Sequence, residues 1–375
     1  MLPALIASHT RLLAASATAI PHLHISNMQA IILGILQGVT ELFPISSLGH
    51  TVLYPSLFGW HALVVSQSQP ESQWLGFVVM LHVGSAIGLL AYFWRDWLLI
   101  VRAWFRTLAR RRVATPTEKL AWLIVISTIP AGILGLSLEH ELRVLLAKPL
   151  AAAIFLSVNG VVLFGGEAAR RRVLTRGGRQ AVPVAIPASP NLSAPTQHLS
   201  GRLAGLLAAP GGAVAGTKDA VPLDPGDGVS GAPTVSASRK GREVADSAEM
   251  AALNYRDALA VGVAQSTALI AGISRDGVCM TTGLARGLSH ETAARFAFLL
   301  ATPVIFAAGF YKLSDFLGPD GVGIRIPGLL GLVFAAAGAV VSVHWLVRWF
   351  RTRNLAPFAV YCLAFGLAMT IYLSI

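Results

Sequence analysis

The sequence predicts an all-α polytopic membrane protein with six transmembrane helices plus two re-entrant helical hairpins, arranged as an inverted-topology repeat. Three observations support this fold class. Hydrophobic residues make up 54% of the 375 positions and charged residues 13%, and the mean hydropathy is +0.65, values that are typical of polytopic membrane proteins. Six stretches are apolar and long enough to cross a bilayer. Two further apolar segments are interrupted by similar polar motifs.

The six predicted spans are Trp74–Trp94, Lys119–Ser137, Pro149–Gly166, Phe296–Tyr311, Ile326–Val347 and Pro357–Ile375. Arginines follow the first, third and fifth spans, and account for most of the net charge of +11. Such charge sets orientation, so we expect no nucleic-acid partner and assign the arginine-rich loops to the inside. The segment from Arg95 to Arg112 interleaves arginines with large apolar residues, which favours an interfacial helix. Both termini and the loop 138–148 are then expected outside.

Four regions follow from these spans. We expect an N-terminal extension (1–27), a first membrane repeat (28–167), a disordered cytoplasmic linker (168–250) and a second membrane repeat (251–375). The linker is assigned because Pro, Gly, Ala and Ser dominate it without apolar periodicity. Each repeat would hold one hairpin and three spans. Cys279 and Cys362 are the two cysteines, and they indicate no disulfide framework.

The first interrupted segment carries polar residues that an apolar helix does not need. They are Gln37, Glu41, Ser46, Ser47 and His50. An ionisable residue at membrane depth costs roughly 2.5 to 3.5 kcal/mol, so it indicates a functional site by default. Pro44 should end the helix near Phe43 and leave Ile45–Gly49 as a loop, with Ser46 or Ser47 capping a second short helix. A merely kinked helix with structural polar contacts is the alternative.

A second copy of this pattern occurs later in the chain. Setting Gly34 on Gly262 without gaps aligns Gln37 with Gln265, Ile45 with Ile273, Ser46 with Ser274, and Gly49 with Gly277. Three spans separate the copies, and because three is odd the second copy must be inverted. Paired interrupted segments of this kind indicate a binding site near the midplane. The first hairpin would enter from outside and the second from inside, so their tips should meet.

The residues at the two tips suggest phosphate chemistry. Arg275 offers a permanent planar charge that suits phosphate oxygens, and Gln37 with Glu41 could hold a divalent cation. Ser46 and Ser47 offer hydroxyls, and His50 could act as acid or base. The sequence therefore predicts hydrolysis or transfer of a lipid-borne phosphate, by a nucleophilic serine or by a metal-activated water. A purely structural pairing of Arg275 with Asp276 or Glu41 is the alternative.

These motifs together resemble the undecaprenyl-diphosphate phosphatase family, the bacterial enzymes associated with bacitracin resistance. The resemblance covers roughly residues 28–167 and 255–375, and includes His82-Val-Gly-Ser and the Ala293-Ala-Arg-Phe-Ala-Phe run. It implies hydrolysis of undecaprenyl diphosphate to the monophosphate and phosphate, which recycles the carrier lipid for peptidoglycan synthesis. It also implies Mg²⁺ or Ca²⁺ as cofactor, a bacterial plasma-membrane location with the active site facing outside, and a possible homodimer.

The family motifs carry over to named residues. Gln37 and Glu41 match its (Glu/Gln)-x-x-x-Glu motif, which implies metal binding. The Pro-x-Ser-Ser-x-Gly-His motif matches at Ser46, Ser47 and His50; together with Glu41 and Arg275 these are the expected catalytic residues. The Pro-Gly-x-Ser-Arg-x-Gly motif implies phosphate binding by Ser274, Arg275 and Gly277.

Departures from the family pattern also occur. Ala271 replaces a usual proline, Asp276 a usual serine, and Leu48 a small or polar residue. A flippase or transporter of polyprenyl phosphate would explain the inverted repeat equally well. The phosphatidic-acid phosphatase type 2 superfamily has similar serine and arginine motifs, but its base would fall at Thr281, so it is disfavoured.

Overall fold

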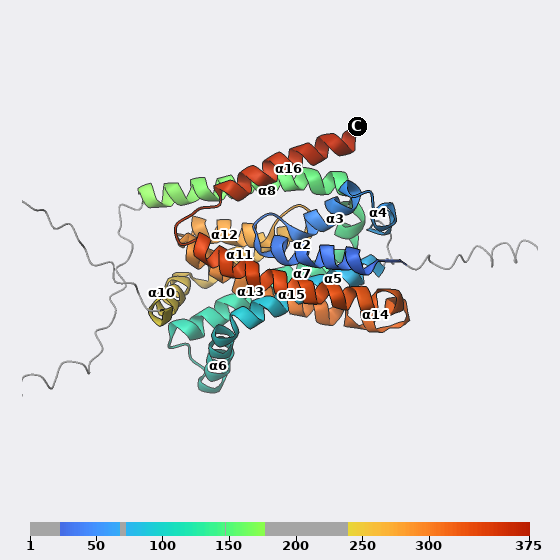
Figure 1. Cartoon of the computed structure of the whole chain (residues 1–375). Coiled ribbons are helices and arrows are strands. Elements are labelled where there is room, and N and C mark those ends of the chain that lie inside the picture. The colour runs from blue at the N-terminus through green and yellow to red at the C-terminus, as the bar shows by residue number, and fades with distance from the viewer. Residues whose placement is uncertain (1–22, 68–72, 147, 177–238) are drawn as a thin grey trace, which may run out of the picture. The chain divides into compact units, whose positions relative to one another are not determined.

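The structure is a computed structural model, and it describes residues 23–67, 73–146, 148–176 and 239–375 (Figure 1). Its regular structure in these residues is helical, without strands. The description below concerns the described residues of the compact unit formed by Met1–Gly178 and Glu243–Ile375.

Six helices in the described residues are long and apolar enough to cross a membrane, which confirms the predicted number. They are α5 (Gln73–Tyr92), α7 (Pro116–Leu146), α8 (Pro149–Arg176), α13 (His290–Tyr311), α15 (Arg325–Trp349) and α16 (Ala356–Ser374). The predicted loop 138–148 is wrong over most of its length, because α7 continues to Leu146. Its Leu and Glu residues are good helix formers and nothing before Pro149 interrupts them.

The predicted linker 168–250 is wrong at both ends. Helix α8 continues to Arg176, and residues 239–252 form helix α10 (Arg239–Ala252). Alanine, arginine and leucine favour the helical extension of α8. Helix α10 is held by tertiary contacts, since Met250 is fully buried and Asp246 lies 2.7 Å from Arg295. Residues 177–238 of the predicted linker, and 1–22 of the predicted extension, lie outside the described residues.

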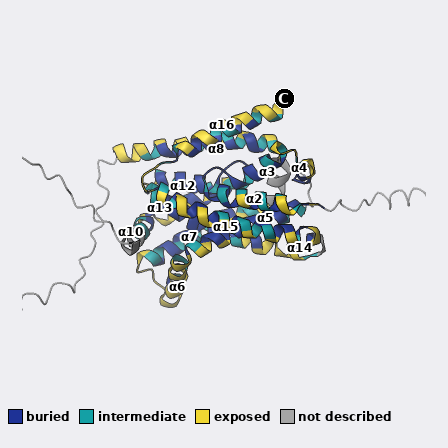
Figure 2. Ribbon diagram, viewed as in Figure 1, coloured by how far each residue is buried: buried dark blue, intermediate teal, exposed yellow. Residues whose placement is uncertain are grey.

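The arginine-rich segment after the first span is helix α6 (Trp94–Arg110). It is amphipathic: Ile100, Ala103 and Thr107 are buried, whereas Trp94 and Phe105 are exposed. Figure 2 shows exposed residues concentrated on α6, on α16 and on the C-terminal end of α8, while α12 and α13 are mostly buried. Exposed apolar residues on α16, such as Val360 and Ile371, suit a face that contacts lipid.

Each interrupted segment forms a pair of shorter helices. The first pair is α2 (Asn27–Leu42) and α3 (Ser47–Leu57); the second is α11 (Tyr255–Ser266) and α12 (Arg275–Ala285). A short 3₁₀ turn, η1 (Thr267–Leu269), follows α11. The remaining helices are short: α4 (His61–Gln67), α14 (Leu313–Leu317) and the 3₁₀ helix η2 (Pro319–Ile324). Figure 1 places α2 and α3 toward the right and α11 and α12 toward the left of the same layer.

Both pairs pack against long helices through glycines. A Cβ atom at Gly34 would lie 2.5 Å from the carbonyl oxygen of Gly331 on α15, and one at Gly262 would lie 2.5 Å from that of Ser127 on α7. No side chain fits at such distances, so glycine allows the helix backbones to approach this closely. Helix α2 therefore packs on α15, and α11 packs on α7.

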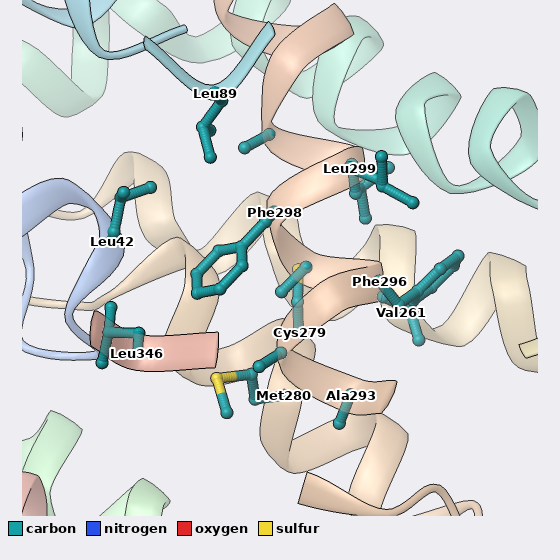
Figure 3. Packing of buried hydrophobic residues seen from close by; sticks show 14 of the residues in the cluster. Leu42, Leu89, Val261, Cys279, Met280, Ala293, Phe296, Phe298, Leu299 and Leu346 are labelled. Carbon is teal, nitrogen blue, oxygen red and sulfur yellow. The ribbon is translucent and has the colours of Figure 1, made fainter. Parts of the chain in front are cut away.

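Helix α13 packs against α12 of the second pair, and its buried side chains belong to a hydrophobic core that also contains residues of the first pair. Its Ala293, Phe296, Phe298 and Leu299 are each at most 1% exposed. Figure 3 shows these side chains packed among residues of neighbouring helices: Leu42 of α2, Leu89 of α5, Val261 of α11, Cys279 and Met280 of α12, and Leu346 of α15. Close packing of this kind fixes the two pairs relative to each other.

Candidate active site

The breaks in the two helix pairs meet at an ion pair between Glu41 and Arg275. Helix α2 ends at Leu42 because Pro44 cannot continue it, and Arg275 is the first residue of α12. The Nη2 atom of Arg275 lies 2.6 Å from Oε1 of Glu41. The two side chains are 13% and 5% exposed. The structure therefore brings together the charged residues of both breaks, as the sequence predicts.

The other oxygen of Glu41 is also fully engaged. Its Oε2 atom accepts hydrogen bonds from Nε2 of Gln37, at 2.8 Å, and from Oγ of Ser47. Nε2 of His82, from α5, lies 3.4 Å from the same oxygen. Glu41 thus contacts the amide of Gln37 on its own helix, the hydroxyl group of Ser47 on α3, the imidazole of His82 on α5 and the guanidinium of Arg275 on α12.

These contacts do not fit the predicted divalent-cation site at Gln37 and Glu41. Such a cation needs several converging oxygen ligands, but Gln37 directs its amide nitrogen at Glu41 and its amide oxygen toward Thr51. The described residues contain no group of three His, Cys, Asp or Glu side chains that could hold a metal. In this arrangement the side-chain oxygens of Gln37 and Glu41 all have hydrogen-bond partners, so no two of them are free to bind a cation.

A cavity of about 300 Å³ opens beside the ion pair. Its polar lining residues are Glu41, Ser46, Ser47, Gln67, His82, Gln265, Ser274 and Arg275. Almost all others are apolar, including Trp74 and Val78 of α5 and Val304 and Ile305 of α13. Nη1 of Arg275 is buried and has no hydrogen-bond partner among the described residues. The cavity therefore combines apolar walls with a guanidinium that has one nitrogen without a hydrogen-bond partner in the described residues.

The serines at the two breaks cap the helices that follow. Ser46 is the N-cap of α3 and accepts from the backbone nitrogen of Gly49, at 3.2 Å; Ser274 caps α12 and accepts from Gly277, at 3.0 Å. The predicted loop Ile45–Gly49 is wrong in its second half, because Ser47 already begins α3. Ser46 has a φ of 69°, a conformation that costs a non-glycine residue about 1 to 3 kcal/mol. Of the predicted phosphate-binding residues, Gly277 donates its backbone N–H to Ser274, and Ser274 lines the cavity.

His50 lies away from the cavity. Its Nδ1 atom donates to the carbonyl oxygen of Ser46, at 2.7 Å, and because a carbonyl can only accept, Nε2 is left to accept from the hydroxyl of Tyr361, at 2.8 Å. The ring is completely buried and stacks on Tyr361 and Phe365. The structure does not bring His50 to Glu41 and Ser47. The histidine that lines the cavity is His82, which the sequence analysis named only as part of the family resemblance and gave no role.

Asn159 of α8 joins the two breaks and was missed by the sequence analysis. Its Nδ2 atom donates to the carbonyl oxygen of Pro44, and its Oδ1 atom accepts from the backbone nitrogen of Ser274, both at 3.0 Å. The side chain is fully buried. One amide thus satisfies an unpaired backbone group in each break. A lone asparagine inside the apolar span Pro149–Gly166 was the available signal.

Asp276 is fully buried beside Arg275. Its Oδ1 atom lies 3.3 Å from Nη2 of Arg275. Neither carboxylate oxygen has a hydrogen-bond partner among the described residues. Arg275 therefore pairs with both Glu41 and Asp276, the two residues that the sequence analysis named as partners in a purely structural role. It also lines the cavity.

The fold and the site define a polytopic membrane protein with a buried cationic group at the polar end of an apolar cavity, an arrangement suited to an amphiphile with an anionic head. The chain belongs to the BacA family, whose model, described as bacitracin resistance protein BacA, matches residues 30–187 and 229–368. It is 46% identical to undecaprenyl-diphosphatase 2 of Frankia alni over 93% of this chain and 98% of the relative.

A second relative comes from another genus. The chain is 42% identical to the undecaprenyl-diphosphatase of Mycolicibacterium paratuberculosis over 94% of this chain and 99% of the relative. The resemblance found in the sequence motifs is therefore confirmed, and the similarity runs through nearly the whole chain.

Proposed function

We propose that this protein hydrolyses undecaprenyl diphosphate to undecaprenyl phosphate and inorganic phosphate, and so recycles the carrier lipid for peptidoglycan synthesis and confers bacitracin resistance. The observation that carries the proposal is the meeting of Glu41 and Arg275 at 2.6 Å beside an apolar cavity. The names of the relatives, which are undecaprenyl-diphosphatases, support the choice of substrate.

The two interrupted helix pairs act, in this proposal, as re-entrant hairpins of an inverted repeat. The aligned glycines support it: Gly34 packs on α15 and Gly262 packs on α7, and each of these is the second span of the opposite repeat. Helices α2, α3, α11 and α12 are also shorter than the candidate spans. With the arginine-rich loops inside a bacterial plasma membrane, the first hairpin opens to the outside and the active site faces outward.

The substrate would lie with its diphosphate at the polar end of the cavity and its isoprenoid chain along the apolar walls. The unpartnered Nη1 of Arg275 is the first contact available to a phosphate oxygen. A phosphate that binds Arg275 competes with Glu41 for the guanidinium. Binding therefore weakens the ion pair and leaves the carboxylate of Glu41 free to accept a proton.

Ser47 is the nucleophile in this mechanism, because its hydroxyl already donates to Glu41. The Oγ atom attacks the terminal phosphorus, the hydroxyl proton passes to Glu41, and the bond to the bridging oxygen breaks, so that undecaprenyl phosphate leaves. Water then attacks the phosphoserine, Glu41 returns the proton to Oγ, and inorganic phosphate is released. Arg275 offsets the negative charge that develops on the transferred phosphoryl group. His50 holds Ser46 in place from outside the cavity.

The predicted Mg²⁺ or Ca²⁺ is assigned to the substrate rather than to the protein in this proposal. Gln37 and Glu41 already satisfy each other, whereas the diphosphate itself carries oxygens that chelate divalent cations. A cation would then arrive with the diphosphate.

Phosphate release from undecaprenyl diphosphate by the purified protein in detergent tests the proposal. We expect turnover by the wild type and nearly complete loss in Glu41→Ala and Arg275→Ala. Arg286→Ala is the matched control, because Arg286 ends the same helix pair but bonds Asp257 at the surface. Normal turnover by Glu41→Ala would refute the site. Absence of release from folded wild type, with transfer of polyprenyl phosphate across proteoliposomes, would favour the transporter instead.

A further inference from the structure

A second cavity lies at the start of α13, whereas the cavity beside Arg275 is lined by residues near the end of that helix. It has a volume of about 380 Å³ and is lined mainly by charged and polar residues. Its walls come from α8 through Arg170, from the start of α13 through Ser289, His290 and Glu291, and from the α15–α16 connection, Phe350–Asn354. All three elements are ends of candidate membrane spans. The cavity therefore lies at the level where lipid head groups meet the protein.

Three arginines face this cavity, and their charge is incompletely balanced. Nε of Arg351 donates to Glu291, at 3.1 Å, which leaves its terminal nitrogens without a bond among the described residues. Arg353 has no ion pair in that part of the chain, and its guanidinium lies over the ring of Trp349. Arg170 contacts Nδ1 of His290. Cationic side chains from two elements thus line a space of molecular size.

The nearby carboxylates are occupied by other partners. Glu167 accepts from Nε2 of His290, at 2.7 Å, and from the backbone nitrogen of Leu355, at 2.8 Å. Glu249 accepts from the backbone and hydroxyl of Ser289. Glu291 is the one acidic lining residue, and it faces Arg351. The cavity therefore keeps a net positive charge and suits an anion.

We propose that this cavity binds a phosphate group, carried by an anionic phospholipid or present as free phosphate, independently of the active site. Guanidinium groups bind phosphate oxygens through paired hydrogen bonds. Basic pockets between transmembrane helices at the cytoplasmic side bind lipid head groups, and the stacked Trp345 and Trp349 beside this one have the amphipathic character of interfacial anchors. The proposal does not rest on the hydrolysis of undecaprenyl diphosphate.

Thermal stability of the full-length protein in zwitterionic detergent tests the proposal. Wild type is titrated with short-chain phosphatidylglycerol, with phosphatidylcholine of equal chain length, and with sodium phosphate. We expect phosphatidylglycerol to raise Tm saturably and phosphatidylcholine to leave it unchanged. An equal, saturable rise with sodium phosphate would identify free phosphate as the ligand. A Tm that responds to neither anion would overturn the proposal.

Variants locate the effect. Arg353→Gln removes a side chain without an ion pair in the described residues, so folding should be kept, and Arg351→Gln adds a second test. Each should weaken the apparent affinity about tenfold, the loss expected for one charge-assisted hydrogen bond. Arg110→Gln with Arg112→Gln removes exposed charge outside the cavity and should change little, and Arg275→Ala should keep the response. Equal weakening in that surface variant, or none in Arg353→Gln, would refute the site.

Discussion

Substitution of Asn159 by alanine should separate catalytic geometry from folding. The amide of Asn159 bonds the carbonyl of Pro44 and the backbone nitrogen of Ser274, and both bonds are buried. Losing them leaves two orphaned polar groups, each at a cost of about 1 to 3 kcal/mol. The thiol of Cys362, 3.9 Å from the Pro44 carbonyl, compensates weakly. The larger part of this cost can be relieved if the two breaks shift apart.

Such a shift would move Glu41 and Ser47 relative to Arg275. A displacement of about 1 Å costs on the order of 100-fold in rate, so kcat of Asn159→Ala should fall about 100-fold while KM changes little, because the apolar walls are untouched. Phosphate release against substrate concentration measures both. Asn159→Asp keeps the acceptor for Ser274 but cannot donate to Pro44 and should be intermediate, whereas Cys362→Ala should match wild type. A folded Asn159→Ala with kcat within twofold of wild type would refute this reasoning.

Four further outcomes are expected. Ser47→Ala should lower kcat by on the order of 10³ to 10⁶, measured by phosphate release; a small loss would exclude it as nucleophile. Tyr361→Phe removes a partner of His50 and should cost about 1 kcal/mol of stability with kcat nearly unchanged, as a denaturation series beside kinetics would reveal. Gly34→Leu should abolish folded protein in size-exclusion chromatography, because the α15 backbone occupies the space. Burial outweighs the ion pair with Arg295 and raises the pKa of Asp246 above its ordinary 3.8. The wild type should therefore lose stability as pH rises through the raised pKa, and Asp246→Asn should lack this loss; equal profiles of Tm against pH for the two proteins would contradict this.

Sequence reasoning was most successful where one residue type imposes a local constraint. Pro44 ends α2 at the expected place, and the length of the apolar runs gives the six long helices. The alignment of Gly34 with Gly262 identified two positions that both face close backbone contacts. These features depend on residues near in sequence or on repetition, both of which can be read without coordinates.

The roles of the two histidines could not be predicted in this way. His50 stands in the polar motif, yet its direction on α3 is set by the capping of that helix, which turns the ring toward Tyr361 of α16, 311 positions away. His82 stands in an apolar run, and its contact with Glu41 depends on how α5 packs beside α2. Motif membership therefore indicated the right neighbourhood but the wrong imidazole for the cavity.

The ion pair of Arg275 with Glu41 explains why the site needs both helix pairs. A buried carboxylate alone would cost several kcal/mol. The guanidinium that pairs with Glu41 comes from the second helix pair, whereas Arg275 also has a carboxylate partner, Asp276, on its own helix. Arg275 lines the cavity, and its Nη1 atom has no hydrogen-bond partner among the described residues. In the proposed mechanism an arriving phosphate satisfies this nitrogen while drawing the guanidinium from Glu41. In this mechanism, the ion pair that stabilises the contact between the two helix pairs is thus the one that an anionic substrate exchanges for its own, and this exchange couples binding of the phosphate to release of the carboxylate that accepts the proton.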